Sequence, residues 1–237
     1  MRLANLGGLA VRITGGTDGS GGGDGPLVVL LHGFGAPADD LIPLGEALVG
    51  PRSAVRFAFP GAPLTLPGLF GAGRAWWMID LARYERVAQG DLAQLGDDVP
   101  PGMEEARALV VAMLDELESA LGVPGERVAL GGFSQGAMLA CDVALRTGRP
   151  LAGLVLMSGM MLCRQEWLRF LPDRRGLRAF QSHGTQDPIV PFVLAAELRD
   201  AMRAAGVEVD WVQFPGGHEI PAQVGAGASA FLARVLG

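Results

Sequence analysis

Short apolar runs alternate along this chain with longer stretches in which apolar residues recur every three or four positions. The short runs are rich in valine, leucine and isoleucine or alternate with polar residues, which predicts strands, and the longer stretches have the period of amphipathic helices. We expect strands at 9–13, 26–31, 54–59, 127–130, 151–157, 177–182 and 207–214, and helices at 39–48, 104–121, 135–146, 191–205 and 221–236. This alternation predicts an α/β fold with a mostly parallel central sheet and helices on both faces.

Two segments break the alternation. Residues 14–25 form a glycine-rich stretch, which we expect to be a flexible loop; it has no lysine and no helix after it, so it is not a phosphate-binding loop. Residues 61–102 place large apolar side chains between prolines and glycines, and two interpretations stay open: a lid or acyl-binding wall, or a core filled over an irregular connection. The substrate-binding candidates within this segment are Leu69, Phe70, Trp76 and Trp77.

Composition narrows the class of protein. The 237 residues show no internal repeat or domain boundary, so we expect a single domain spanning 1–237. The net charge of −6 and the lack of a basic block argue against a nucleic-acid partner. No apolar run is long enough for stable membrane insertion, and residues 1–8 lack the apolar region of a signal peptide, which predicts a cytoplasmic protein. Cys141 and Cys163 lack metal-ligand spacing, so we expect no metal.

The most informative motif is the sequence G-F-S-Q-G at 132–136, which directly follows an apolar run and directly precedes an apolar helix. A sharp strand-to-helix turn of this kind needs small residues on both sides and exposes its serine above the sheet. We therefore expect Ser134 to be a nucleophile and the backbone N–H of Gln135 to stabilise an oxyanion.

Chain order selects the base. In this architecture the nucleophile, the acid and the histidine follow one another along the chain. His218 lies beyond Ser134 in a glycine-rich turn after the strand at 207–214, whereas His32 precedes Ser134. We expect His218 to be the base, and we expect His32 and His183 to bond their own loops.

The acid has several candidates, namely Asp142, Asp173, Asp187, Asp200 and Asp210. Asp187 follows the strand at 177–182, in a loop stiffened by prolines, which suits a carboxylate held against an imidazole. Asp142 and Asp200 fall on expected helices, where a solvated or capping carboxylate is the simpler interpretation. Glu219 adjoins the histidine too closely to reach its ring. We therefore favour Asp187.

A second oxyanion donor is expected in the loop after the buried strand at 26–31. His32-Gly33-Phe34-Gly35 follows this strand, and glycines on both sides of Phe34 allow its N–H to turn toward Ser134.

The loop 32–35, the motif 132–136, the segment H-G-T-Q-D-P-I-V-P at 183–191 and G-H-E-I at 217–220 resemble, in order, the motifs of the phospholipase/carboxylesterase family. That resemblance covers the chain from about residue 26 and implies an α/β-hydrolase fold. It implies the same roles for Ser134, Asp187, His218, Phe34 and Gln135.

The chain departs from the acyl-protein thioesterases of that family at Ala36 and Pro37, where they usually carry an acidic residue. It also departs at 76–80, where W-W-M-I-D only loosely matches their Trp-Phe-Asp segment. We therefore expect a serine carboxylesterase acting on short- to medium-chain acyl esters, with no cofactor and a small-molecule ester as its partner. The alternatives that stay open are an acyl thioesterase, a lysophospholipase, a peptidase and a catalytically idle binding protein. The oligomeric state also stays open, with a homodimer as one candidate.

Overall fold

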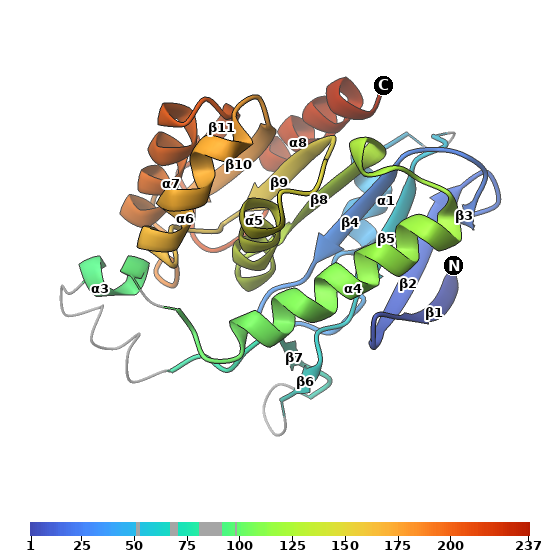
Figure 1. The fold of residues 1–237 in the computed structure, drawn as a ribbon, viewed down its shortest axis with the longest axis horizontal. Helices are drawn as coiled ribbons and strands as arrows, with labels where there is room; N and C mark the ends of the chain where they lie inside the picture. The colour runs from blue at the N-terminus through green and yellow to red at the C-terminus, as the bar shows by residue number, and fades with distance from the viewer. Residues whose placement is uncertain (51–52, 67–70, 81–91, 98) are drawn as a thin grey trace.

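The computed structural model describes residues 1–50, 53–66, 71–80, 92–97 and 99–237 (Figure 1). Within these residues, the main sheet has nine strands in the order β1-β2-β5-β4-β8-β9-β10-β11, with β3 paired to β2. The strands are β1 (Arg2–Leu6), β2 (Leu9–Gly16), β3 (Ser20–Gly22), β4 (Leu27–Leu31), β5 (Arg56–Pro60), β8 (Val128–Phe133), β9 (Gly153–Met157), β10 (Arg178–Gly184) and β11 (Glu208–Phe214). All neighbours from β5 to β11 are parallel, and β2 runs antiparallel to β1 and β5. The expected mostly parallel sheet is confirmed.

Helices cover both faces of this sheet (Figure 1). Successive side chains of a strand point to opposite faces, so Leu27 and Val29 of β4 pack in one apolar cluster and Val28 and Leu30 in another. The first cluster includes residues of α4 (Met103–Leu121), α5 (Gln135–Thr147), α6 (Arg164–Phe170) and α7 (Phe192–Ala204), and the second those of α8 (Ala222–Leu236) and Leu48 of α1 (Ile42–Leu48). Burial on both faces explains why β4 is apolar at every position.

The ends of several helices and strands can be explained by the residues at those positions. The expected helix at 104–121 ends at Gly122, whose φ of 60° is left-handed and whose N–H bonds the last turn. The expected helix at 39–48 starts later, at Ile42, with Pro43 in its first turn. The strand expected at 127–130 continues to Phe133, because the glycines after Leu130 pair with β9.

The expectation of a flexible loop at 14–25 is wrong. β2 extends to Gly16 and β3 occupies Ser20–Gly22. The carboxylate of Asp18 closes the turn between them by accepting the N–H groups of Ser20 at 2.8 Å and Gly22 at 2.9 Å. These hydrogen bonds hold the pKa of Asp18 at about 2, below its usual value. A short polar side chain therefore supplies the order that the glycines lack.

The irregular segment 61–102 contains the hairpin of β6 (Leu64–Thr65) and β7 (Arg74–Ala75) and the short helix α3 (Leu92–Asp97). Trp76 and Trp77, which follow β7, are 1% and 4% exposed and belong to the core. Leu69 and Phe70 lie outside the described residues. The described part of the segment thus supplies core side chains, as one of the two interpretations requires, and the acyl-binding wall stays a prediction.

Asp142 was expected to be solvated or to cap a helix, and this expectation is wrong. The side chain is fully buried between α4, α5 and α6. Its carboxylate accepts hydrogen bonds of 2.8 Å from Arg107, Arg146 and the indole of Trp167. Arg107 and Arg146 share this single buried carboxylate, so it ties three helices together.

Replacing Asp142 with alanine should lower the free energy of unfolding by about 3–5 kcal/mol, because two guanidinium groups lose a buried partner. Asp210 is the matched control, since its ion pair with Arg234 is about half exposed. Asp210→Ala should cost less than about 1 kcal/mol. Chemical denaturation measures both, and equal losses in the two variants would contradict the central role of Asp142.

Candidate active site

Ser134 stands between the end of β8 and the start of α5 with a φ of 54°. Its N–H donates to the carbonyl of Met157 on the neighbouring strand, at 2.8 Å, which holds this uncommon conformation in place. Gly132 and Gly136 flank the turn, and a Cβ on either would overlap the carbonyl oxygen of Leu31. The turn therefore requires glycine because of the close approach of β4.

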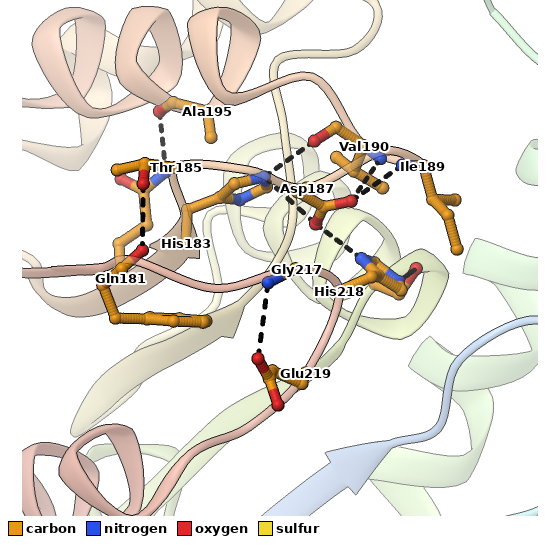
Figure 2. Close-up of polar contacts among 12 residues, drawn as sticks. Gln181, His183, Thr185, Asp187, Ile189, Val190, Ala195, Gly217, His218 and Glu219 are labelled. Atoms are coloured by element: carbon orange, nitrogen blue, oxygen red, sulfur yellow. Dashed lines mark hydrogen bonds and ion pairs between the residues drawn. The ribbon is translucent and has the colours of Figure 1, made fainter.

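The three side chains expected to act together lie in one hydrogen-bonded row. His218 Nε2 lies 2.9 Å from Ser134 Oγ, and His218 Nδ1 lies 2.7 Å from Asp187 Oδ2. Figure 2 shows the imidazole facing the Asp187 carboxylate. Because a carboxylate only accepts, we assign the ring proton to Nδ1, which leaves Nε2 free to accept from the serine hydroxyl. The arrangement suits proton transfer from Ser134 to His218.

The side chain of Asp187 is inaccessible to solvent and is held on both of its oxygens. Oδ1 accepts the backbone N–H groups of Ile189 and Val190, both at 2.9 Å, while Oδ2 faces His218 (Figure 2). Burial alone would raise the pKa of Asp187, but the hydrogen bonds from His218 and from the two N–H groups outweigh it, so the net pKa is lowered. The carboxylate is therefore ionised and oriented toward the imidazole.

His183 lies beside this carboxylate (Figure 2). The residue is fully buried. Its Nε2 is 2.9 Å from the carbonyl of Val190 and 3.4 Å from Asp187 Oδ2. His32 has a similar place in its own loop, with Nδ1 2.8 Å from the carbonyl of Gly33 and Nε2 accepting the N–H of Ala62 at 3.1 Å. Burial lowers the pKa of both histidines. They bind the backbone of loops that carry candidate residues.

The lowered pKa values of His32 and His183 predict how stability depends on pH. A group held neutral in the folded protein binds a proton more readily after unfolding, so the free energy of unfolding should fall as the pH drops below about 6.5. Each histidine contributes at most about 1.4 kcal/mol per pH unit. Urea denaturation between pH 7 and pH 5 measures the decline, and His183→Gln should make it shallower. Equal wild-type stability at pH 7 and pH 5 would refute this prediction.

The two candidate oxyanion donors come from different segments. Gln135 is the first residue of α5, and Phe34 belongs to the loop after β4. Gly33 brings that loop against the nucleophile, since a Cβ on Gly33 would lie 3.5 Å from Ser134 Cβ. The structure therefore places Ser134 between the segments that carry the two donors.

The role of the Gln135 side chain was not predicted from the sequence. This side chain is buried, and its amide bonds the backbone of both Trp76 and Trp77. One signal was present: Gln135 is a polar residue at the start of an otherwise apolar helix, and a buried amide needs hydrogen-bond partners. Its partners lie 58 and 59 residues away, so the motif alone did not identify them.

The described residues contain neither a metal-binding cluster nor a membrane-spanning helix. Within that part of the chain, no group of three or more His, Cys, Asp or Glu side chains could hold a metal ion. None of the helices described there combines the length and the apolar character needed to cross a membrane.

A groove of about 320 Å³, lined by apolar residues such as Leu48, Val55 and Leu232, lies where β4 and β5 begin. Ser134 follows the opposite end of the parallel sheet, so this groove is separate from the candidate site.

The chain is similar in sequence to known members of one enzyme family. A profile of the phospholipase/carboxylesterase family matches residues 22–236. Acyl-protein thioesterase 1 of Cryptococcus neoformans var. neoformans is 28% identical over 168 residues, which are 70% of this chain and 67% of that protein. Acyl-protein thioesterase 1 of Eremothecium gossypii is 31% identical over 169 residues, which are 69% and 66% of the two chains.

Solved structures agree with these matches. Esterase PE8 superposes with a TM-score of 0.80 and 28% identity, over 96% of this chain and 99% of its own. A carboxylesterase from Mesorhizobium loti superposes with a TM-score of 0.75 and 20% identity, over 98% of both chains. These likenesses confirm the α/β-hydrolase fold expected from the sequence.

Proposed function

We propose that this chain, which belongs to the phospholipase/carboxylesterase family, is a serine carboxylesterase. Its nucleophile would be Ser134, its base His218 and its acid Asp187. The observation that carries the proposal is the continuous row of hydrogen bonds, 2.9 Å from Ser134 to His218 and 2.7 Å from His218 to Asp187. Ester hydrolysis as such is supported by the family and by its esterase neighbours.

The first step is acylation. Ser134 Oγ bonds to the ester carbonyl carbon while its proton moves to His218 Nε2, and the carbonyl electrons move onto oxygen. The N–H groups of Phe34 and Gln135 stabilise this oxyanion, a contribution of about 3–4 kcal/mol per donor in comparable enzymes. Collapse breaks the bond to the alcohol oxygen, which takes the proton from His218. Asp187 stabilises the imidazolium that exists between these two transfers.

The second step is deacylation. A water molecule gives its proton to His218 Nε2 and attacks the acyl carbon, and the Ser134 oxygen leaves with that proton. The buried position of Asp187 and its two backbone donors keep the carboxylate aligned with the ring through both steps.

Two observations bear on the substrate class. The aligned relatives are named acyl-protein thioesterases, yet Ala36 and Pro37 replace the acidic position usual in that subgroup. We propose short- to medium-chain acyl esters, with a thioester or a lysophospholipid as the second candidate, because esters and thioesters share a similar tetrahedral intermediate. A single domain spanning 1–237, a cytoplasmic location and a homodimer stay predictions of the sequence.

Fluorophosphonate labelling tests the proposal directly. The purified protein should form a covalent adduct, and peptide mapping should find it on Ser134. A panel of p-nitrophenyl esters of graded chain length, with a lysophospholipid and an acyl-CoA alongside, should then rank the substrate classes. A folded protein that neither labels at Ser134 nor hydrolyses any of these would instead be a binding protein on a hydrolase scaffold.

Chain-length preference tests the role proposed for the irregular segment. Replacing Leu69 and Phe70 with alanine should lower kcat/KM for longer acyl chains more than for acetate, because each lost methylene contact is worth about 0.8 kcal/mol. Steady-state kinetics on the same ester panel measures the effect. A proportional loss for acetate and longer esters would show that these residues do not contact the acyl chain.

A further inference from the structure

The two candidate oxyanion donors need a fixed spacing, because stabilisation of a tetrahedral intermediate depends on where the donors stand before the reaction begins. Phe34 and Gln135 are about a hundred residues apart in sequence and belong to separate elements. A third segment, residues 74–77, bonds to both elements. We call it the bridging segment; it begins with β7, in the hairpin that stands outside the main sheet in Figure 1.

The bridging segment bonds to the start of α5 through the side chain of Gln135. Oε1 of Gln135 accepts the N–H of Trp76 at 2.9 Å, and Nε2 donates to the carbonyl of Trp77 at 2.9 Å. The side chain is 2% exposed, so no solvent competes for these bonds. A flipped amide would place donor against donor and acceptor against acceptor, so the two partners determine its orientation.

The bridging segment bonds to the Phe34 loop at three points. The indole N–H of Trp76 donates to the carbonyl of His32 at 2.9 Å. The carbonyl of Arg74 accepts the N–H of Gly35 at 2.9 Å, and the N–H of Arg74 donates to the carbonyl of Ala36 at 3.0 Å. These contacts lie on both sides of Phe34 and leave its loop little freedom to move relative to β7.

We propose that the Gln135 side chain and Trp76 are positioning residues that set the distance between the Phe34 and Gln135 N–H groups. The inference rests on the proposed function of Ser134. It gives part of the segment 61–102 a role in the chemical step, which differs from the lid or acyl-binding wall expected from the sequence. Neither side chain touches the substrate; each acts through the backbone that it holds.

A displaced donor affects the tetrahedral intermediate more than the bound ester, so the loss should appear in kcat and not in KM. Removing a whole oxyanion donor costs on the order of 10²–10³ in kcat. A donor that is moved but still present should cost less, about tenfold to a hundredfold, with KM changed less than about threefold.

Two variants and one matched control test the proposal. Gln135→Met has a similar length and keeps the backbone N–H while losing both amide bonds. Trp76→Phe removes the indole donor to His32 together with part of the buried ring volume, and it keeps the backbone N–H that Gln135 accepts. Trp167→Phe is the control, since Trp167 is equally buried and its indole donates to Asp142, outside the candidate site. Each protein is assayed for kcat, KM and the inhibition constant of a trifluoromethyl ketone, which forms a tetrahedral oxyanion on the serine.

The proposal is supported if both variants lose kcat and trifluoromethyl ketone affinity by similar factors while Trp167→Phe keeps both. It is overturned if a folded variant keeps kcat within twofold, if inhibitor affinity stays unchanged while kcat falls, or if the control loses as much. Should Gln135→Met fail to fold, Trp76→Phe decides by the same criteria. A wild-type protein that neither labels at Ser134 nor hydrolyses esters overturns the proposed function, whereas wild-type activity with unaffected variants overturns this inference alone.

Discussion

Ser134→Ala should lower kcat for p-nitrophenyl acetate by at least about 10⁴-fold, because loss of the nucleophile in comparable triads costs several orders of magnitude. The fold should survive the change. The Ser134 side chain makes no capping hydrogen bond to α5, and the backbone bond to Met157 does not involve the hydroxyl. Circular dichroism and the melting temperature verify folding, and initial rates give kcat.

Ser158 provides the matched control. It also follows a strand end and has a φ of 53°, close to that of Ser134, although Ser158 is fully buried and Ser134 is partly exposed. Its hydroxyl has no hydrogen-bond partner among the described residues, so Ser158→Ala should keep wild-type kcat. A folded Ser134→Ala protein that retained more than about a tenth of wild-type kcat would exclude Ser134 as the nucleophile.

His218→Gln should lower kcat/KM by about 10⁴-fold or more, since no other group lies within hydrogen-bond distance of Ser134 Oγ in the described structure. The loss should appear in kcat and in kcat/KM alike, because the base takes part in the chemical step. Initial rates on an uncharged ester, measured for both proteins at the same pH, give the ratio.

Glu219→Gln is the control for this experiment, because Glu219 is the next residue along the chain but its carboxylate faces the N–H of Gly217. This variant should keep most of the wild-type rate. If a folded His218→Gln protein hydrolysed the ester at an undiminished rate, His218 would not be the base.

Much of the candidate site could be predicted because its chemistry is local or ordered along the chain. The glycines at 132 and 136 signalled a crowded turn, and the structure gives the physical reason in the approach of the Leu31 carbonyl. Strand ends supplied the loops of Asp187 and His218, and parallel strands bring such ends to one edge of a sheet. Apolar runs on β4 indicated burial on both faces, which two separate clusters confirm.

Partners distant in sequence could not be predicted in this way, because hydrophobic periodicity describes a residue's own face and not what packs against it. Asp142 looked like a surface carboxylate on a helix, yet Arg107, 35 residues away, and Trp167, 25 residues away, make it a buried junction. Asp18 ordered a turn that glycine content alone had suggested to be flexible.

The sequence by itself determined the fold class and the residues to be tested as nucleophile, base and acid, because motif spacing and chain order carry that information. Only the tertiary structure decided how these residues are supported. The amide of Gln135 bonds the backbone of residues 58 and 59 positions away, and Trp76 bonds the carbonyl of His32, 44 positions away. Such contacts exist only after the sheet has brought the segments together, since no local preference of either segment specifies the other.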